Sequence, residues 1–166
     1  MARFFVALWP SCEAARASAA IHDAWAWSAS ARPTTDAHLH VTLRFIGEVT
    51  NARVEAFAET LGVEADGFSL RLDRVSLWTN GIAALEPSIV TPRLTGLRAK
   101  VDACLANVDV ANETRAYHPH VTLARDARGS TAPPRIDAID WRVDGYALVE
   151  SRGGRYSIVR RYPLAG

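Results

Sequence analysis

The sequence predicts an α+β protein of two similar α/β lobes, with largely antiparallel sheets around a central cleft and helices outside. Two observations predict this fold. Strand and helix patterns alternate along the first part of the chain, and several strand patterns follow one another at its end. The segment His38–Leu43 also recurs as His118–Leu123 with one difference, 80 residues further on. This repeat predicts two half-chains related by a pseudo-twofold axis, with the two copies facing each other across a groove.

Length and charge limit the class of protein. The chain has 166 residues, 49% of them hydrophobic, and a formal net charge of +1. We expect a single domain over residues 1–166, made of two intertwined lobes, because no long polar linker divides the chain. The near-zero charge excludes a generally polybasic protein that coats nucleic acid or anionic membranes, although it is compatible with a local basic cleft.

The elements of the first half follow from local patterns. An apolar run predicts a strand over residues 3–9, and the Ala-rich segment 12–29 predicts a helix that Ser11 can cap. Alternation with a period of two predicts a strand over 38–46. Apolar residues at helical spacing predict a second helix over 51–61.

The second half begins with strand-like residues 68–78. An Asn-Gly turn then leads into 82–85, which predicts a hairpin. A Thr-Pro start and a long apolar stripe predict a helix over 92–108. Strands are expected at 120–125, 139–150 and 156–162, with a Gly- and Pro-containing loop between the first two and a Gly-Gly turn before the last.

The repeated motif carries the candidate chemistry. Side chains two apart on a strand share a face, so His40 and Thr42 point to one side, as do His120 and Thr122. One neutral imidazole can take a proton from a nucleophile while a protonated one gives a proton to a leaving oxygen. Threonine hydroxyls can donate hydrogen bonds to phosphate oxygens. The motif pair therefore predicts displacement at phosphorus with neither a metal nor a covalent intermediate.

Other interpretations of these residues remain open. A single strand histidine is most often structural, and only the duplication favours catalysis. The imidazoles of His38, His40, His118 and His120 could instead hold a transition metal, although no carboxylate completes either copy. We expect no metal and no cofactor. His22, in the Ala-rich helix, is expected to be solvated.

The remaining composition suggests the cell compartment. Cys12 and Cys104 are too few and too distant for a disulfide framework, so both are expected to be reduced thiols. The apolar start is too short for a signal-peptide core, and no run is long enough for a membrane helix. These features predict a cytoplasmic protein without membrane association.

The segments His40-Val-Thr42-Leu-Arg-Phe45-Ile-Gly47 and His120-Val-Thr122-Leu-Ala-Arg125 resemble the paired His-x-Thr-x motifs of the two-histidine phosphoesterase superfamily. Within it they are similar to the RNA 2′,3′-cyclic phosphodiesterases, historically called 2′-5′ RNA ligases. The first strand and the closing segment 148–164 also resemble that family, so the resemblance covers essentially the whole chain. It implies hydrolysis of a terminal 2′,3′-cyclic phosphate on RNA to a 2′-phosphomonoester without a metal, together with reversible 2′-5′ ligation.

The resemblance also implies roles for individual residues. His40 would be the proton donor to the 3′ oxygen, His120 the acceptor that activates water, and Thr42 and Thr122 phosphate ligands. Arg125 belongs to the second motif and would bind phosphate, but strand parity places it on the face of the buried aliphatic residues unless a bulge re-aims it. Arg44 lies an even number of residues from His40 and Thr42, so it could face the cleft with them. An arginine that is simply exposed on the strand would have the same position.

The expected partner is an RNA with a 2′,3′-cyclic phosphate end, or a related nucleotide, bound by a monomer. Tyr156 and Trp78 are candidates for stacking on a base, whereas Phe45 shares the face of the core residues. Two alternative functions use the same residues. One is a phosphodiesterase for a small cyclic nucleotide or a 2′-5′ oligoadenylate, and the other is an RNA-end-binding module with weak catalysis.

Overall fold

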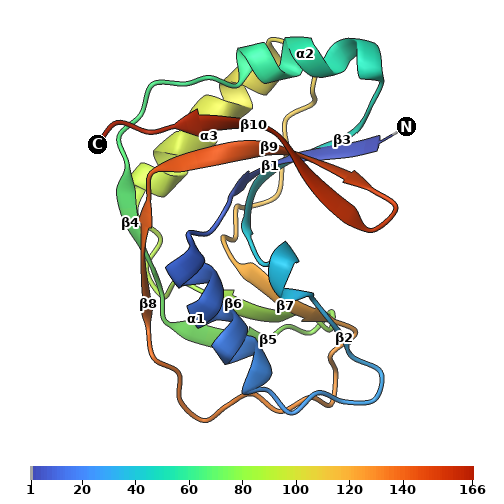
Figure 1. Ribbon diagram of the computed structural model, residues 1–166, viewed down its shortest axis with the longest axis vertical. Coiled ribbons are helices and arrows are strands. Elements are labelled where there is room, and N and C mark those ends of the chain that lie inside the picture. The colour runs from blue at the N-terminus through green and yellow to red at the C-terminus, as the bar shows by residue number, and fades with distance from the viewer. Residues whose placement is uncertain (1) are drawn as a thin grey trace.

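The computed structural model describes residues 2–166 (Figure 1). The helices are α1 (Cys12–Asp23), the 3-10 helix η1 (Asp36–His38), α2 (Asn51–Thr60) and α3 (Pro92–Ala106). The strands are β1 (Ala2–Leu8), β2 (Arg32–Pro33), β3 (Val41–Val49), β4 (Phe68–Leu72), β5 (Arg74–Leu77), β6 (Ala83–Glu86), β7 (Val121–Arg125), β8 (Ile139–Val143), β9 (Gly145–Arg152) and β10 (Arg155–Pro163). Among these residues, no helix is long and apolar enough to cross a membrane.

The order of the strands reveals the pseudo-twofold arrangement. The large sheet runs β10-β9-β1-β3-β7-β6-β5, with β2 added beside β7. The order is symmetric about the contact between the motif strands β3 and β7, because β1 corresponds to β6 and β9 to β5. Among the described residues, β3 and β7 share only the pair Val41 and Val121, so the sheet divides into two lobes there. The predicted bilobal α+β fold with antiparallel pairing is confirmed.

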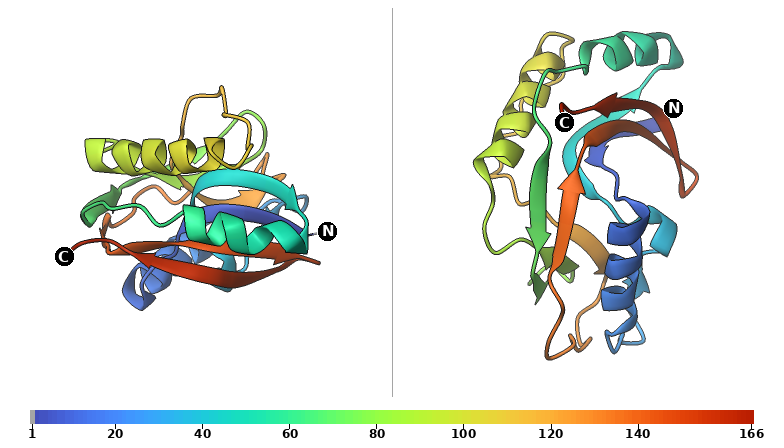
Figure 2. Two further views of the ribbon diagram at one scale, coloured as in Figure 1. Left: turned by 90° about the horizontal axis from the view of Figure 1, so that it is seen from above. Right: turned by 60° about the vertical axis from the view of Figure 1, so that its left-hand side comes forward.

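The helices lie outside the sheet, on different lobes. Helices α2 and α3 cover the lobe of β1, β3, β9 and β10, whereas α1 lies at the other end of the molecule, beside the lobe of β5, β6 and β7 (Figure 1). Strands β4 and β8 form a separate two-stranded sheet that runs along one side between the lobes (Figure 2). Because α3 follows β6 in the chain yet packs on β3, the chain passes back and forth between the lobes.

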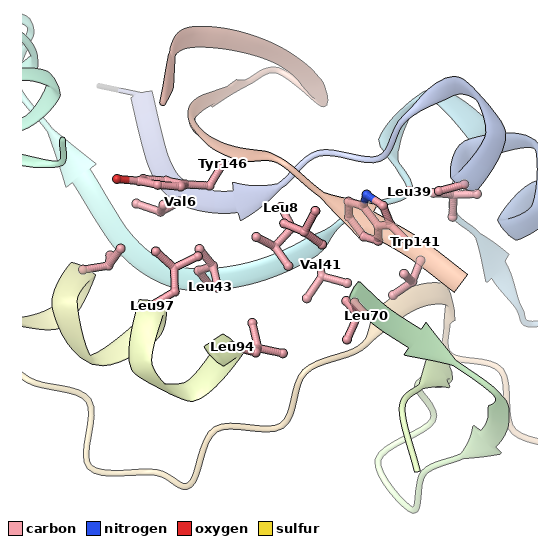
Figure 3. Close-up of a cluster of buried hydrophobic side chains, with 14 of the residues drawn as sticks. Val6, Leu8, Leu39, Val41, Leu43, Leu70, Leu94, Leu97, Trp141 and Tyr146 are labelled. Atoms are coloured by element: carbon pink, nitrogen blue, oxygen red, sulfur yellow. The ribbon is translucent and has the colours of Figure 1, made fainter. Parts of the chain in front are cut away.

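The aliphatic residues of both motifs form part of one continuous core. Val41, Leu43, Val121 and Leu123 are each at most 2% exposed. Figure 3 shows Val41 and Leu43 on the side of β3 that faces Leu94 and Leu97 of α3. Burying such a side chain stabilises the fold by about 1.5–3 kcal/mol. The buried faces of β3 and β7 therefore hold the two motifs in place.

The starts of α1 and α3 agree with the local signals, and one helix end does not. Ser11 caps α1, its hydroxyl accepting from the backbone N–H of Ala14 at 3.2 Å, and Thr91 caps α3. The prediction of a helix over 12–29 is wrong at its end, because α1 stops at Asp23. Beyond it the ring of Trp25 is buried and Ala26 forms a backbone bridge with Thr131. These contacts with a distant loop outweigh the helix propensity of the segment.

Two predicted strands each divide between the sheets. Residues 68–78 form β4, which pairs with β8, and then β5, which pairs with β6. Residues 139–150 likewise form β8 and then β9. The predicted strand 38–46 is shifted, since β3 begins at Val41 after η1. A change of partner sheet leaves the period of two intact, so the pattern could not reveal it.

Candidate active site

One cavity of about 400 Å³ joins the two lobes. Its wall includes every residue that the sequence singled out for the chemistry, namely His40, Thr42, His120, Thr122 and Arg125. Each lobe thus contributes one imidazole and one hydroxyl to the same space. The aromatic residues Phe45, Trp78 and Tyr156 also line this cavity.

A β-bulge at the same position of each motif decides which side chains reach the cavity. In the ladder of β1 with β3, Leu43 is an extra residue, and Leu123 is the extra residue between β6 and β7. The extra residue reverses the alternation of faces beyond it. Phe45 and Arg125 therefore turn toward the cavity, where strict parity would have placed them in the core.

This reversal corrects two expectations. Phe45 is not a core residue, because its side chain is 58% exposed and lines the cavity. Arg44 forms part of the cavity wall but is not a free cation there, since it is only 6% exposed and its Nε donates to Asp102 of α3 at 2.9 Å. Arg125, for which parity and motif disagreed, lines the cavity.

His40 is held in one tautomer and largely shielded from solvent. Its Nδ1 lies 2.7 Å from the carbonyl oxygen of His38, which can only accept, so Nδ1 carries the proton. In the neutral ring Nε2 then accepts from the Thr42 hydroxyl at 3.0 Å. The rings of Phe5 and Trp9 stack on the imidazole at centroid distances of 4.9 and 5.4 Å. Burial lowers the pKa of His40 from 6.5 to about 4.

His120 repeats this arrangement in the other lobe. Its Nδ1 donates to the carbonyl oxygen of His118, again at 2.7 Å, which leaves the Nε2 lone pair available. The indole of Trp78 contacts the imidazole with the ring centroids 4.5 Å apart. Burial lowers the pKa of His120 as well. Both motifs thus present the same nitrogen, Nε2, as the reactive atom.

A family model described as the 2′-5′ RNA ligase superfamily matches residues 7–155. The chain belongs to this superfamily. A curated relative from Escherichia coli (strain K12), named RNA 2′,3′-cyclic phosphodiesterase, is 31% identical over 140 residues, which cover 80% of each chain. A protein of the same name from Thermus thermophilus is 28% identical over 151 residues, covering 81% of this chain and 76% of its own.

A solved structure shows the same fold. The crystal structure of E. coli LigT complexed with 3′-AMP superposes with a TM-score of 0.85 at 24% identity, over 99% of both chains. The superfamily resemblance inferred from the two motifs is therefore confirmed over nearly the whole chain.

A partly buried ionic network behind the superfamily motif of the first lobe was missed by sequence reasoning. Arg44 and Arg98 both donate to Asp102 at 2.9 Å, and both reach Glu113. Tyr117 donates to the backbone carbonyl of Thr42 at 2.9 Å. These contacts tie the segment between α3 and β7 to β3. Their members are up to 75 residues apart along the chain, so no local pattern could have revealed them.

In the part of the chain that the structure describes, the motif imidazoles do not form a group of three or more ligand atoms close enough to hold a metal ion. Within residues 2–166, the group whose ligand atoms lie close enough for an ion is His22, Asp23 and Asp36, outside the cavity wall.

His22 is not solvated as expected. It is buried against the ring of Trp27, and its Nδ1 lies 3.1 Å from the Asp23 carboxylate.

Proposed function

We propose that this protein hydrolyses the terminal 2′,3′-cyclic phosphate of RNA to a 2′-phosphomonoester by metal-independent acid/base catalysis. The observation that carries the proposal is the geometry of the two imidazoles. His40 and His120 immediately precede the pseudo-equivalent strands β3 and β7, share one tautomer and line one cavity with Thr42, Thr122 and Arg125. The printed names of the E. coli and T. thermophilus relatives support the same activity.

The groups around the cavity suit a bound cyclic phosphate. The hydroxyls of Thr42 and Thr122 donate hydrogen bonds to its non-bridging oxygens, and the Arg125 guanidinium neutralises the anion. His120 Nε2 takes a proton from water, and the oxygen of that water attacks phosphorus. The bond from phosphorus to the 3′ oxygen breaks as His40 Nε2–H gives its proton to that oxygen. A 5′-hydroxyl in place of water forms a 2′-5′ bond by the same steps.

Binding of the substrate also supplies the protonation state that this chemistry needs. Burial lowers the pKa of both histidines in the free protein, so both are mainly neutral at pH 7. A phosphate anion beside Nε2 favours the charged ring and raises its pKa. His40 therefore takes up its proton together with the substrate, and donates it when the 3′ oxygen leaves.

The same cavity accounts for recognition of the nucleoside. Phe45, Tyr156 and Trp78 offer aromatic rings on which bases can stack, and each stacking contact is worth about 1–3 kcal/mol. Because both motifs of one chain line a single cavity, one copy contains the whole set of reactive groups. We propose that the protein acts as a monomer, with both lobes in one domain, on RNA ends in the cytoplasm, where Cys12 and Cys104 stay reduced.

The decisive experiment follows a 2′,3′-cyclic-phosphate oligonucleotide by phosphorus NMR, with and without a chelator. We expect conversion to the 2′-phosphomonoester in both conditions, and a loss of about 10²–10⁴-fold in rate in His40→Ala and in His120→Ala. Thermal unfolding of each variant shows that the loss is not caused by unfolding. Activity abolished by the chelator would contradict the proposal in favour of a metal enzyme.

The alternative functions are separated by substrate choice. A kcat/KM much higher for a mononucleotide 2′,3′-cyclic phosphate or a 2′-5′ oligoadenylate than for the oligonucleotide would identify a small-nucleotide phosphodiesterase. Tight binding of RNA ends with no turnover of any cyclic phosphate would identify a binding module.

A further inference from the structure

Glu86 is a buried carboxylate in the lobe of His120. It ends β6 and is only 5% exposed. In the ladder with β7, Ala84 lies opposite Thr122 and Leu85 opposite Val121. Continued one step beyond the ladder, this register puts Glu86 opposite His120 on the same face, and the charge of Glu86 acts on the His120 ring.

Hydrogen bonds keep the Glu86 carboxylate ionised, and the carboxylate in turn holds an aromatic ring. Glu86 accepts from the indole Nε1 of Trp78 at 3.2 Å and from Arg74 at 3.3 Å. Burial alone would raise the pKa of Glu86, but hydrogen bonds from Ser76, Trp78 and Arg74 outweigh it and lower the pKa. The indole that Glu86 holds is the ring in contact with His120.

The matching position of the other lobe has no charge. In the ladder of β1 with β3, Ala7 lies opposite Thr42 and Leu8 opposite Val41, and the same register continued one step puts Trp9 opposite His40. Its indole stacks on the imidazole with an interplanar angle of 10°. The pseudo-twofold axis thus relates a carboxylate beside one reactive histidine to a neutral ring beside the other.

We propose that Glu86 is a positioning residue that makes His120 the proton acceptor of the pair. It fixes the imidazole through Trp78, and its negative charge stabilises the imidazolium formed when water gives its proton to Nε2. Glu86 keeps its own charge throughout and touches neither water nor phosphate. The inference rests on the proposed function, since it assigns a direction to that reaction.

Four groups must be considered in any titration of His120. Glu86 on β6 favours the charged ring, whereas His118 and Arg125 on its own segment disfavour it. His40 across the cavity is coupled to His120 as well. Of these four groups, Glu86 is the one negative charge, so its removal should shift the pKa of His120 in the opposite direction to removal of any of the others.

The first test is Glu86→Gln, which keeps the size of the side chain and an oxygen for the Trp78 N–H but removes the charge. NMR titration of the histidine Cε1 protons should show a lower pKa for His120 than in the unmodified protein. The acidic limb of the rate profile should move to lower pH, and kcat should fall by about three- to tenfold, a part of the 10²–10⁴-fold that a positioned proton transfer contributes. KM should not rise, because the substitution removes a negative charge that repels the phosphate of the substrate.

Two further variants provide the controls. Glu55→Gln removes an equal charge from an exposed position on α2 and should leave the His120 titration and the rate unchanged. Arg74→Gln removes the cation that partly neutralises Glu86, so the pKa of His120 should rise. Because the Arg74 side chain is 55% exposed, this variant tests the charge effect even where Glu86→Gln fails to fold.

An unchanged pKa of His120 in the folded variants would overturn the inference. A fall in kcat with the same pH profile would also overturn it, because this would show that Glu86 acts only as a hydrogen-bond acceptor. If the protein hydrolyses no cyclic phosphate, the proposed function fails, and the titration of His120 still decides whether Glu86 sets its charge.

Discussion

Replacing His40 by Asn should make the folded protein less sensitive to acid. In the folded chain burial lowers the pKa of His40 from 6.5 to about 4, so in mild acid the unfolded chain binds a proton there that the folded chain does not. The stability that depends on neutral His40 is complete above pH 6.5. It is lost as the pH falls toward 4, and below 4 both states carry the proton.

The size of this effect follows from the shift. A change from 6.5 to about 4 corresponds to about 3 kcal/mol, at about 1.4 kcal/mol for each unit of pKa. His40 lies in the wall of a cavity rather than in the closed core, so water lowers the penalty. We therefore expect about 2 kcal/mol of the free energy of unfolding to be lost between pH 7.5 and pH 4.5 through this group.

Urea unfolding at these two pH values measures the difference. At pH 7.5 His40→Asn should be less stable than the unmodified protein, because it loses the stacking on Phe5 and Trp9. At pH 4.5 the gap should close by about 2 kcal/mol, with unchanged denaturant dependence. A gap for His40→Asn that is the same at both pH values would refute the reasoning.

Substitutions at three other positions test the cavity wall and its support. Arg125→Ala should lower kcat/KM for the cyclic-phosphate oligonucleotide by about 10²-fold, since the charge-assisted hydrogen bonds contribute about 1.5–3 kcal/mol. Arg125→Lys should lower it by less. Steady-state rates equal to those of the unmodified protein would contradict this role. Phe45→Ala should raise KM about tenfold through lost base stacking and leave the melting temperature unchanged, because the ring is exposed; an unchanged KM would exclude stacking there. Tyr117→Phe should lower the free energy of unfolding by about 1 kcal/mol, because the carbonyl of Thr42 loses its donor; equal urea midpoints would show that this bond is not stabilising.

Local signals predicted the helices and their starts. Ser11 and Thr91 each lie next to the helix that they cap, and the apolar stripe of α3 repeats every three or four residues, so the sequence contains these signals directly. The predicted end of α1 was wrong because Ala26 and Ser28 are held by contacts with a loop about a hundred residues away. The division of residues 68–78 and 139–150 between two sheets was not predicted for the same reason, because it depends on partner strands that are distant in the chain.

The sequence by itself determined the pseudo-twofold fold and the chemical groups of the site. The two copies of the repeat differ at one position only, and alternation along a strand places His40 with Thr42, and His120 with Thr122, whatever lies around them. The family resemblance rests on the same residues.

Only the tertiary structure decided how those groups differ from one another. The bulges at Leu43 and Leu123 depend on the register of partner strands, and they turn Phe45 and Arg125 into the cavity. Glu86 meets His120 through such pairing too, since an apolar pattern does not say which strands will be neighbours. Burial, which shifts the pKa of each histidine, is produced by segments far apart in the chain. Two motifs that are nearly identical as sequence therefore become two chemically different sites.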